Sequence, residues 1–138
     1  MQNSPSKRPT LTRVIAAVAI VFGALTLKEG GAVLFGDGTA RTAAGHFVPF
    51  VVWFNFLAGF AYIVAGVGLW MQQRWAAWLA VGVAVATAIA FAAFGMRVLG
   101  GGAYEMRTVW AMTLRTLLWA AIAALSWRLT SGRSGAMR

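Results

Sequence analysis

The chain has 138 residues, of which 60% are hydrophobic and only 11% are charged. Soluble domains carry about 25% charged residues, so this composition predicts a membrane protein with the lipid bilayer as its partner. The lack of cysteine excludes disulfides and thiolate metal sites, and the single histidine excludes a bis-histidine haem within one chain. The net charge of +9 does not indicate nucleic-acid binding, because the basic residues gather at segment ends, where topology and anionic lipid account for them.

The first third of the chain predicts one membrane crossing. Residues 1–10 are polar and are predicted to form a disordered cytoplasmic tail. The apolar run that follows reaches the length of a comfortable crossing only if it continues past Glu29, since about 20 residues span the hydrocarbon core. We therefore predict a first transmembrane helix over residues 11–35. The segment from Thr39 to His46 is too polar to cross and is predicted to lie at the outer surface.

Three further transmembrane helices are predicted, over residues 47–71, 76–98 and 107–128. The third helix of the chain is rich in alanine on every face, which favours close packing and a central position. Serine and glycine in residues 129–138 predict a second cytoplasmic tail. The predicted fold class is all-α, a polytopic membrane protein with four transmembrane helices in an antiparallel bundle.

The distribution of charge predicts the orientation of this bundle. The side that holds both termini carries seven basic residues and no acid, whereas the opposite side carries four basic residues and all three acids. Because basic residues concentrate on the cytoplasmic side, both termini are predicted to be cytoplasmic in a bacterial inner (plasma) membrane. The seven basic residues are Lys7, Arg8, Arg13, Arg74, Arg128, Arg133 and Arg138.

Arg115 is the charge that stands out, because it lies about eight residues inside the last helix, or about 12 Å from its start. A guanidinium at that depth must face protein, water or a carboxylate. Depth counting selects Glu29 and Asn55 as neighbours, with Tyr62 below them and Trp119 on the same helix face as Arg115. We predict a buried polar network or ligand site from these five residues, and a purely structural role that fixes helix register remains the alternative.

Small residues at three- and four-residue spacing line one face of each of the first two predicted helices. Such stripes allow two backbones to approach closely, so we predict that these two faces meet. The stripes are Ala16, Ala19, Gly23, Thr26 and Gly30 on the first helix, and Asn55, Gly59, Tyr62 and Gly66 on the second.

A second polar cluster is predicted at the outer surface, formed by Asp37, His46, Glu105 and Arg107. Histidine and carboxylates can bind Zn²⁺, but the sequence lacks the spacing of a metal-ligand motif, so we predict no metal site. His46 is instead expected to anchor the start of the second helix at the interface. No nucleophile–base pair or phosphate-binding loop is present in the sequence, so we predict no catalytic residue, which favours a protein without enzymatic activity but does not decide the question.

Several residues of the first two helices carry a resemblance to a known family. Arg13, Phe22-Gly23, Lys28 and the run Ala65-Gly66-Val67-Gly68-Leu69 before Arg74 resemble the DoxX-like group of small four-helix bacterial membrane proteins. The resemblance covers about the first 80 residues. The resemblance implies an association with membrane subunits that take part in the quinone-linked oxidation of sulfur compounds. It implies no catalytic residue in this chain.

These observations favour a non-catalytic accessory or assembly subunit of a membrane complex. One alternative is an oligomeric transporter or channel component for a small solute or ion, built around Arg115. Another is a redox subunit that interacts with a quinone or lipid beside Arg115, Tyr62 and Trp119. No cofactor is predicted for the first function, and a quinone or lipid is the ligand of the last. Partners are expected to be another membrane protein or further copies of the chain. A monomer without a cavity, in which Glu29 fully pairs Arg115, would favour the accessory function. An oligomeric axis that passes Arg115 would favour transport, and an apolar pocket that opens to the membrane beside Tyr62 and Trp119 would favour a lipophilic ligand.

Overall fold

The computed structural model describes the backbone of residues 7–136 and the side chains of residues 10–129. Within this part of the chain there are five helices and no strand: α1 (Lys7–Phe35), α2 (Thr39–Ala44), α3 (Pro49–Trp70), α4 (Arg74–Leu99) and α5 (Met106–Ala136). Four of them contain a segment long and apolar enough to cross a membrane, as expected of a small multi-pass integral membrane protein. These segments are Thr10–Phe35, Pro49–Trp70, Arg74–Leu99 and Met106–Leu129.

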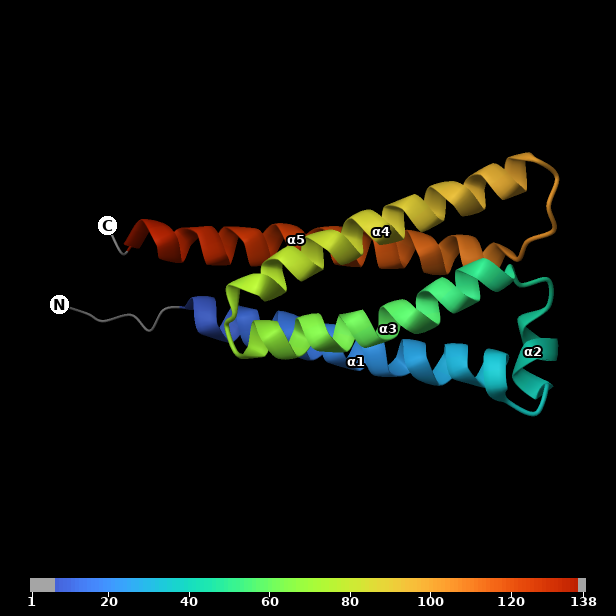
Figure 1. The fold of residues 1–138 in the computed structure, drawn as a ribbon, viewed down its shortest axis with the longest axis horizontal. Helices are drawn as coiled ribbons and strands as arrows, with labels where there is room; N and C mark the ends of the chain where they lie inside the picture. The colour runs from blue at the N-terminus through green and yellow to red at the C-terminus, as the bar shows by residue number, and fades with distance from the viewer. Residues whose placement is uncertain (1–6, 137–138) are drawn as a thin grey trace.

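The long helices lie side by side along one axis, and the chain reverses direction between consecutive long helices (Figure 1). The start of α1 and the end of α5 lie at one end of the molecule, together with the short turn between α3 and α4. We call this the terminal end. The opposite end holds α2 and the loop between α4 and α5, and we call it the α2 end.

The closest helix pair is α1 with α3, and glycine explains why. A Cβ atom added at Gly23 of α1 would lie 2.9 Å from the carbonyl oxygen of Gly59 in α3, and one added at Gly66 would lie 3.0 Å from the carbonyl oxygen of Ala16. Only residues without a side chain allow the two backbones to approach this closely. The predicted meeting of the two small-residue stripes is confirmed.

The alanine-rich helix α4 does not occupy the central position predicted from its composition. It contacts α3 and α5, while α1 packs mainly on α3. Gly82 and Gly95 of α4 face open space, and the α2 end of the helix diverges from its neighbours in Figure 1. Small side chains allow a close approach but do not enforce one, and here the close approach occurs between α1 and α3 instead.

The buried apolar residues form two clusters. The larger cluster joins α1, α3, α4 and α5, and its largest members are Tyr62 and Trp119, whose rings stack at 4.6 Å. The smaller cluster lies toward the α2 end and consists of Val48, Val51, Ala90, Phe94 and Met112. The four largest fully buried side chains are shared between the clusters, with Trp119 and Tyr62 in the larger one and Phe94 and Met112 in the smaller one.

Three of the long helices, α1, α4 and α5, extend further than the sequence predicted, whereas α3 is shorter than the predicted 47–71. α1 begins at Lys7, since Pro9 falls in its first turn, where no backbone N–H is needed. α5 continues to Ala136 because no proline interrupts it, and the segment at 39–44 forms the short helix α2. Residues 1–6 and 137–138 of the two predicted tails lie outside the described residues.

Candidate functional site

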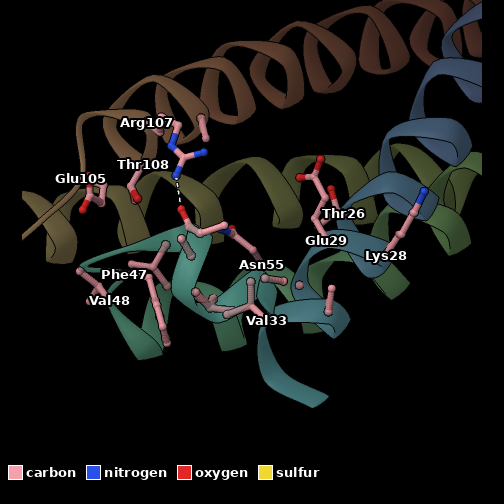
Figure 2. Close-up of a pocket in the computed structure, with 18 of the residues that line it drawn as sticks. Thr26, Lys28, Glu29, Val33, Phe47, Val48, Asn55, Glu105, Arg107 and Thr108 are labelled. Atoms are coloured by element: carbon pink, nitrogen blue, oxygen red, sulfur yellow. Dashed lines mark hydrogen bonds between the residues drawn. The ribbon is translucent and has the colours of Figure 1, made fainter. Parts of the chain in front are cut away.

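A cavity of about 500 Å³ opens at the α2 end, between α1, α2, the start of α3 and the first half of α5 (Figure 2). Its volume lies within the range of about 300–1,000 Å³ that is typical of small-molecule sites. More than half of the residues that line it are apolar or glycine, among them Val33, Phe47, Val51 and Ala111. A few polar side chains on these walls give the cavity its chemistry.

Arg115 lines the cavity from α5. Its guanidinium carbon lies 5.6 Å from the centre of the Phe22 ring of α1, which is a cation–π contact. Phe22 in turn packs on Tyr62, and Tyr62 stacks on Trp119. The guanidinium therefore contacts the first of three rings that pack on one another, and its Nε atom is buried without a hydrogen-bond partner among the described residues.

Glu29 and Asn55 line the same cavity, as depth counting predicted. The exposed Glu29 side chain projects from α1 toward α5 in Figure 2, and its carboxylate attracts the Arg115 guanidinium without forming an ion pair with it. The Asn55 Oδ1 atom is buried and accepts no hydrogen bond from the described residues. The three polar side chains thus lie around one space, and no direct bond among them is present in this part of the chain.

Tyr62 and Trp119 do not line the cavity and lie fully buried beneath it. The Tyr62 hydroxyl lies within electrostatic range of Arg115 and near Thr87 of α4. Within the described part of the chain, the Tyr62 hydroxyl, the Thr87 hydroxyl and the Trp119 indole nitrogen all lack a hydrogen-bond partner. The lining residues furthest toward the terminal end are Thr26, Asn55 and Arg115, and these buried side chains lie beyond them.

Helix α2 forms one wall of the cavity and is held there from two sides. On the α5 side, Arg107 donates a hydrogen bond of 2.6 Å to the Ala43 carbonyl, which Figure 2 shows as a dashed line, and a Glu105 carboxylate oxygen accepts one of 2.9 Å from the His46 backbone N–H. On the α1 side, Arg41 donates to the last carbonyls of α1. The two glycines that flank α2 adopt positive φ angles, 98° at Gly38 and 67° at Gly45.

The predicted surface cluster of Asp37, His46, Glu105 and Arg107 divides between two places. Glu105 and Arg107 line the cavity, whereas Asp37 and His46 do not. Asp37 is exposed and accepts a hydrogen bond of 3.0 Å from the Thr39 backbone N–H. This bond favours the charged carboxylate and lowers the pKa of Asp37 below its usual range.

The charges around the cavity sum to one positive. Lys28, Arg107 and Arg115 contribute three positive charges, and Glu29 and Glu105 contribute two negative charges. Lys28 is exposed and points away from Asn55 (Figure 2), and Arg107 already donates to a carbonyl of α2. Among the described residues that line the cavity, Arg115 is therefore the cation that lies deepest along the helices and has a buried donor without a partner.

Phe22 is the important site residue that the sequence reasoning did not name as one. It supports the Arg115 guanidinium, although no polar atom marks it. Its spacing provided the available signal, since Phe22, Thr26 and Glu29 recur at intervals of four and three residues and share one face of α1.

Comparison of the chain with protein-family models, with curated proteins and with solved structures found no match. The geometry of the cavity therefore carries the functional conclusion.

Proposed function

We propose that this chain is a small bacterial inner-membrane protein that binds a ligand with a polar head and an apolar body in the cavity at the α2 end. The observation that carries the proposal is the unpaired, buried Nε atom of Arg115 at an apolar cavity of about 500 Å³. A guanidinium without a partner is costly in a membrane interior, and a ligand acceptor offsets that cost. Arg115 acts in this proposal as an intramembrane ligand-binding residue.

The proposed topology follows from the predicted orientation. With both termini in the cytoplasm, the four long helices form an antiparallel bundle whose α2 end faces the outer side of the membrane. The cavity then opens toward the outer surface, and Arg115 marks its depth within the membrane.

The resemblance to DoxX-like proteins supports a role within a larger membrane complex. In this proposal the chain is an accessory subunit that holds a ligand for a partner membrane protein or for further copies of itself, and it carries out no chemistry. The cavity supports ligand binding better than a simple assembly role, because Arg115 faces an open space instead of a paired carboxylate.

A quinone is a second candidate ligand for the same cavity. A quinone carbonyl accepts a hydrogen bond from Arg115, and the hydroxyl of the reduced quinol donates one to the free Asn55 Oδ1 atom. Transport is less well supported, since the cavity ends at Thr26, Asn55 and Arg115, and the fully buried Tyr62 and Trp119 fill the space beyond them.

The absence of native cysteine provides a direct test of the cavity. Ala111→Cys places a thiol on the cavity wall, and Ala80→Cys places one in the fully buried core as a matched control. In the detergent-purified protein, a small water-soluble thiol reagent is expected to modify position 111 at least about tenfold faster than position 80. Equal rates would mean that the cavity is not accessible, and the proposed function would be abandoned.

Native mass spectrometry of the same preparation tests for a retained ligand. The wild-type protein is expected to carry an additional small-molecule mass, and Ala111→Trp is expected to lose it because the indole fills the cavity. Ala120→Trp, an exposed position on the same helix, serves as the control and is expected to retain the ligand. An identical ligand on both variants would show that it binds elsewhere.

A further inference from the structure

The charge around the cavity limits the kind of head group that it accepts. Because the five charged side chains sum to one positive charge, a ligand with a single negative charge leaves the cavity neutral. The Glu29 carboxylate projects toward α5 and opposes a second negative charge at the same place. A dianionic phosphate monoester is therefore disfavoured, and a monoanion is favoured.

The orientation of the Arg115 guanidinium further limits which ligand head groups can bind. The guanidinium uses one face for its contact with Phe22, and its Nε atom is buried. The N–H groups at the end of the guanidinium are therefore the ones placed to donate to a ligand. A carboxylate matches such an edge with two parallel hydrogen bonds. Asn55, which now presents Oδ1 without a partner, can donate to the same carboxylate after rotation of its amide group.

The depth of Arg115 excludes most ordinary membrane lipids. Arg115 lies nine residues after Met106, the first residue of α5, and therefore about 14 Å along the helix from the α2 end. A phospholipid head group lies in the interfacial region, above this depth. The cavity volume of about 500 Å³ is that of one drug-sized molecule, which fits a single short chain better than two acyl chains.

We propose that the cavity binds a single-chain amphiphile with a carboxylate head, of the fatty-acid type, whose carboxylate pairs with Arg115 and whose chain lies along the apolar walls near Val51 and Ala111. This inference rests on the proposed function, because it names the ligand class of the same cavity. Arg115 supplies the charge recognition, and Phe22 positions its guanidinium.

The test uses full-length protein in phosphatidylcholine nanodiscs and three probes of equal chain length: decanoate, decanol and decylammonium. Calorimetry measures the affinity of each probe at pH 7. Decanoate is expected to bind at least about tenfold more tightly than decanol, which is the factor that a charge-assisted hydrogen bond provides. Arg115→Gln is expected to remove this preference, and Arg115→Lys to retain part of it. Arg97→Gln, an exposed cation outside the cavity lining at the same end, is expected to leave it unchanged.

Each contrary result has a defined meaning. If decanol or decylammonium binds as tightly as decanoate, or if decanoate does not bind, the carboxylate assignment fails. Reactivity of Ala111→Cys would still support the proposed function in that case. If phosphatidylglycerol in the nanodisc displaces decanoate from the wild type, the source of the anion is a membrane lipid and the single-chain assignment fails. A thermal unfolding measurement shows whether Arg115→Gln is folded. If it is not folded, Arg115→Lys is used instead, and unchanged affinity and selectivity for decanoate in that variant would overturn the role of the guanidinium.

Discussion

The two ends of this bundle differ in how they use side-chain volume. Toward the terminal end, Tyr62 and Trp119 stack and fill the space between the helices, and both are fully buried. Toward the α2 end, the corresponding space is lined by small residues such as Gly30, Ala43 and Ala111, and a cavity remains. The same four helices therefore make a packed half and a hollow half. The hollow half has its own buried cluster, with Phe94 and Met112 as its largest members, but the space between α1, α2, α3 and α5 is left unfilled. The only charged side chain with a buried, unpaired atom, among the described residues, lies at the boundary.

The largest effect is expected from breaking the packed half. Trp119→Ala removes the ring that stacks on Tyr62 and leaves a cavity in the larger core, so the free energy of unfolding should fall by about 3–5 kcal/mol. Denaturant unfolding in detergent micelles measures this loss. Trp110→Ala is the matched control, since Trp110 is 70% exposed on the same helix and should change the free energy by well under about 1 kcal/mol. Similar losses in both variants would contradict the proposed division of the bundle.

A smaller effect is expected at the interface that joins both halves. Gly23→Ile introduces a side chain whose Cβ atom would lie 2.8 Å from Ile63 and 2.9 Å from the Gly59 carbonyl oxygen, so α1 and α3 must separate. The expected loss is about 1–3 kcal/mol in the free energy of unfolding. Gly82→Ile is the control, because a Cβ atom at Gly82 meets nothing within 4 Å. Equal stability of the two variants would show that the helix pair does not depend on its close approach.

A weak coupling is expected in the hollow half. From the sequence, Glu29→Gln and Arg115→Met are each predicted to lower thermal stability in detergent, with partial recovery in the double variant. Because these two described residues form no direct ion pair, the coupling free energy between the two substitutions is expected to lie below about 1 kcal/mol. A double-mutant cycle in micelles measures it. A coupling of 3 kcal/mol or more, roughly the range for a buried pair, would contradict the open geometry of the cavity.

The smallest effect is expected at the surface next to α2. The Thr39 N–H stabilises the charged form of Asp37 and lowers its pKa, so the stabilisation is complete above the ordinary aspartate pKa of about 3.9 and is lost as the pH falls through the lowered value. An NMR titration of the Asp37 carboxyl carbon should give a midpoint below that of a model peptide. The Thr39 amide should exchange faster in Asp37→Ala at neutral pH. A midpoint at or above the peptide value would exclude this hydrogen bond in solution.

Much of the fold could be predicted from the sequence, because long apolar runs and small-residue spacing are local signals. The four membrane-crossing segments and the contact between the Gly23 and Gly59 stripes follow from them. The central place assigned to α4 was wrong, since an alanine-rich surface is compatible with several neighbours. The short helix α2 was not predicted as a helix, because the hydrogen bonds that hold it in place, donated by Arg41 and Arg107 and accepted by Glu105, join it to other segments of the chain.

The candidate site shows the same division. Counting residues along helices places Glu29, Asn55 and Arg115 at similar depths, and they line one cavity in the structure. Depth alone does not distinguish a bonded group from three side chains around an open space. Whether these side chains bond to one another depends on the position of the guanidinium against Phe22 and on the distance between α5 and α1. Both are set by the packing of the helices.

The sequence by itself determined that the chain has four helices able to cross a membrane, that two of them approach closely, and that one arginine lies deep within the last. Hydropathy, glycine spacing and helical rise are properties of each segment alone. Only the tertiary structure decided that Arg115 faces a cavity instead of a carboxylate. Which part of the space between the helices is filled, as by Tyr62 and Trp119, and which part stays open depends on how the helices are arranged, and no single segment contains that information.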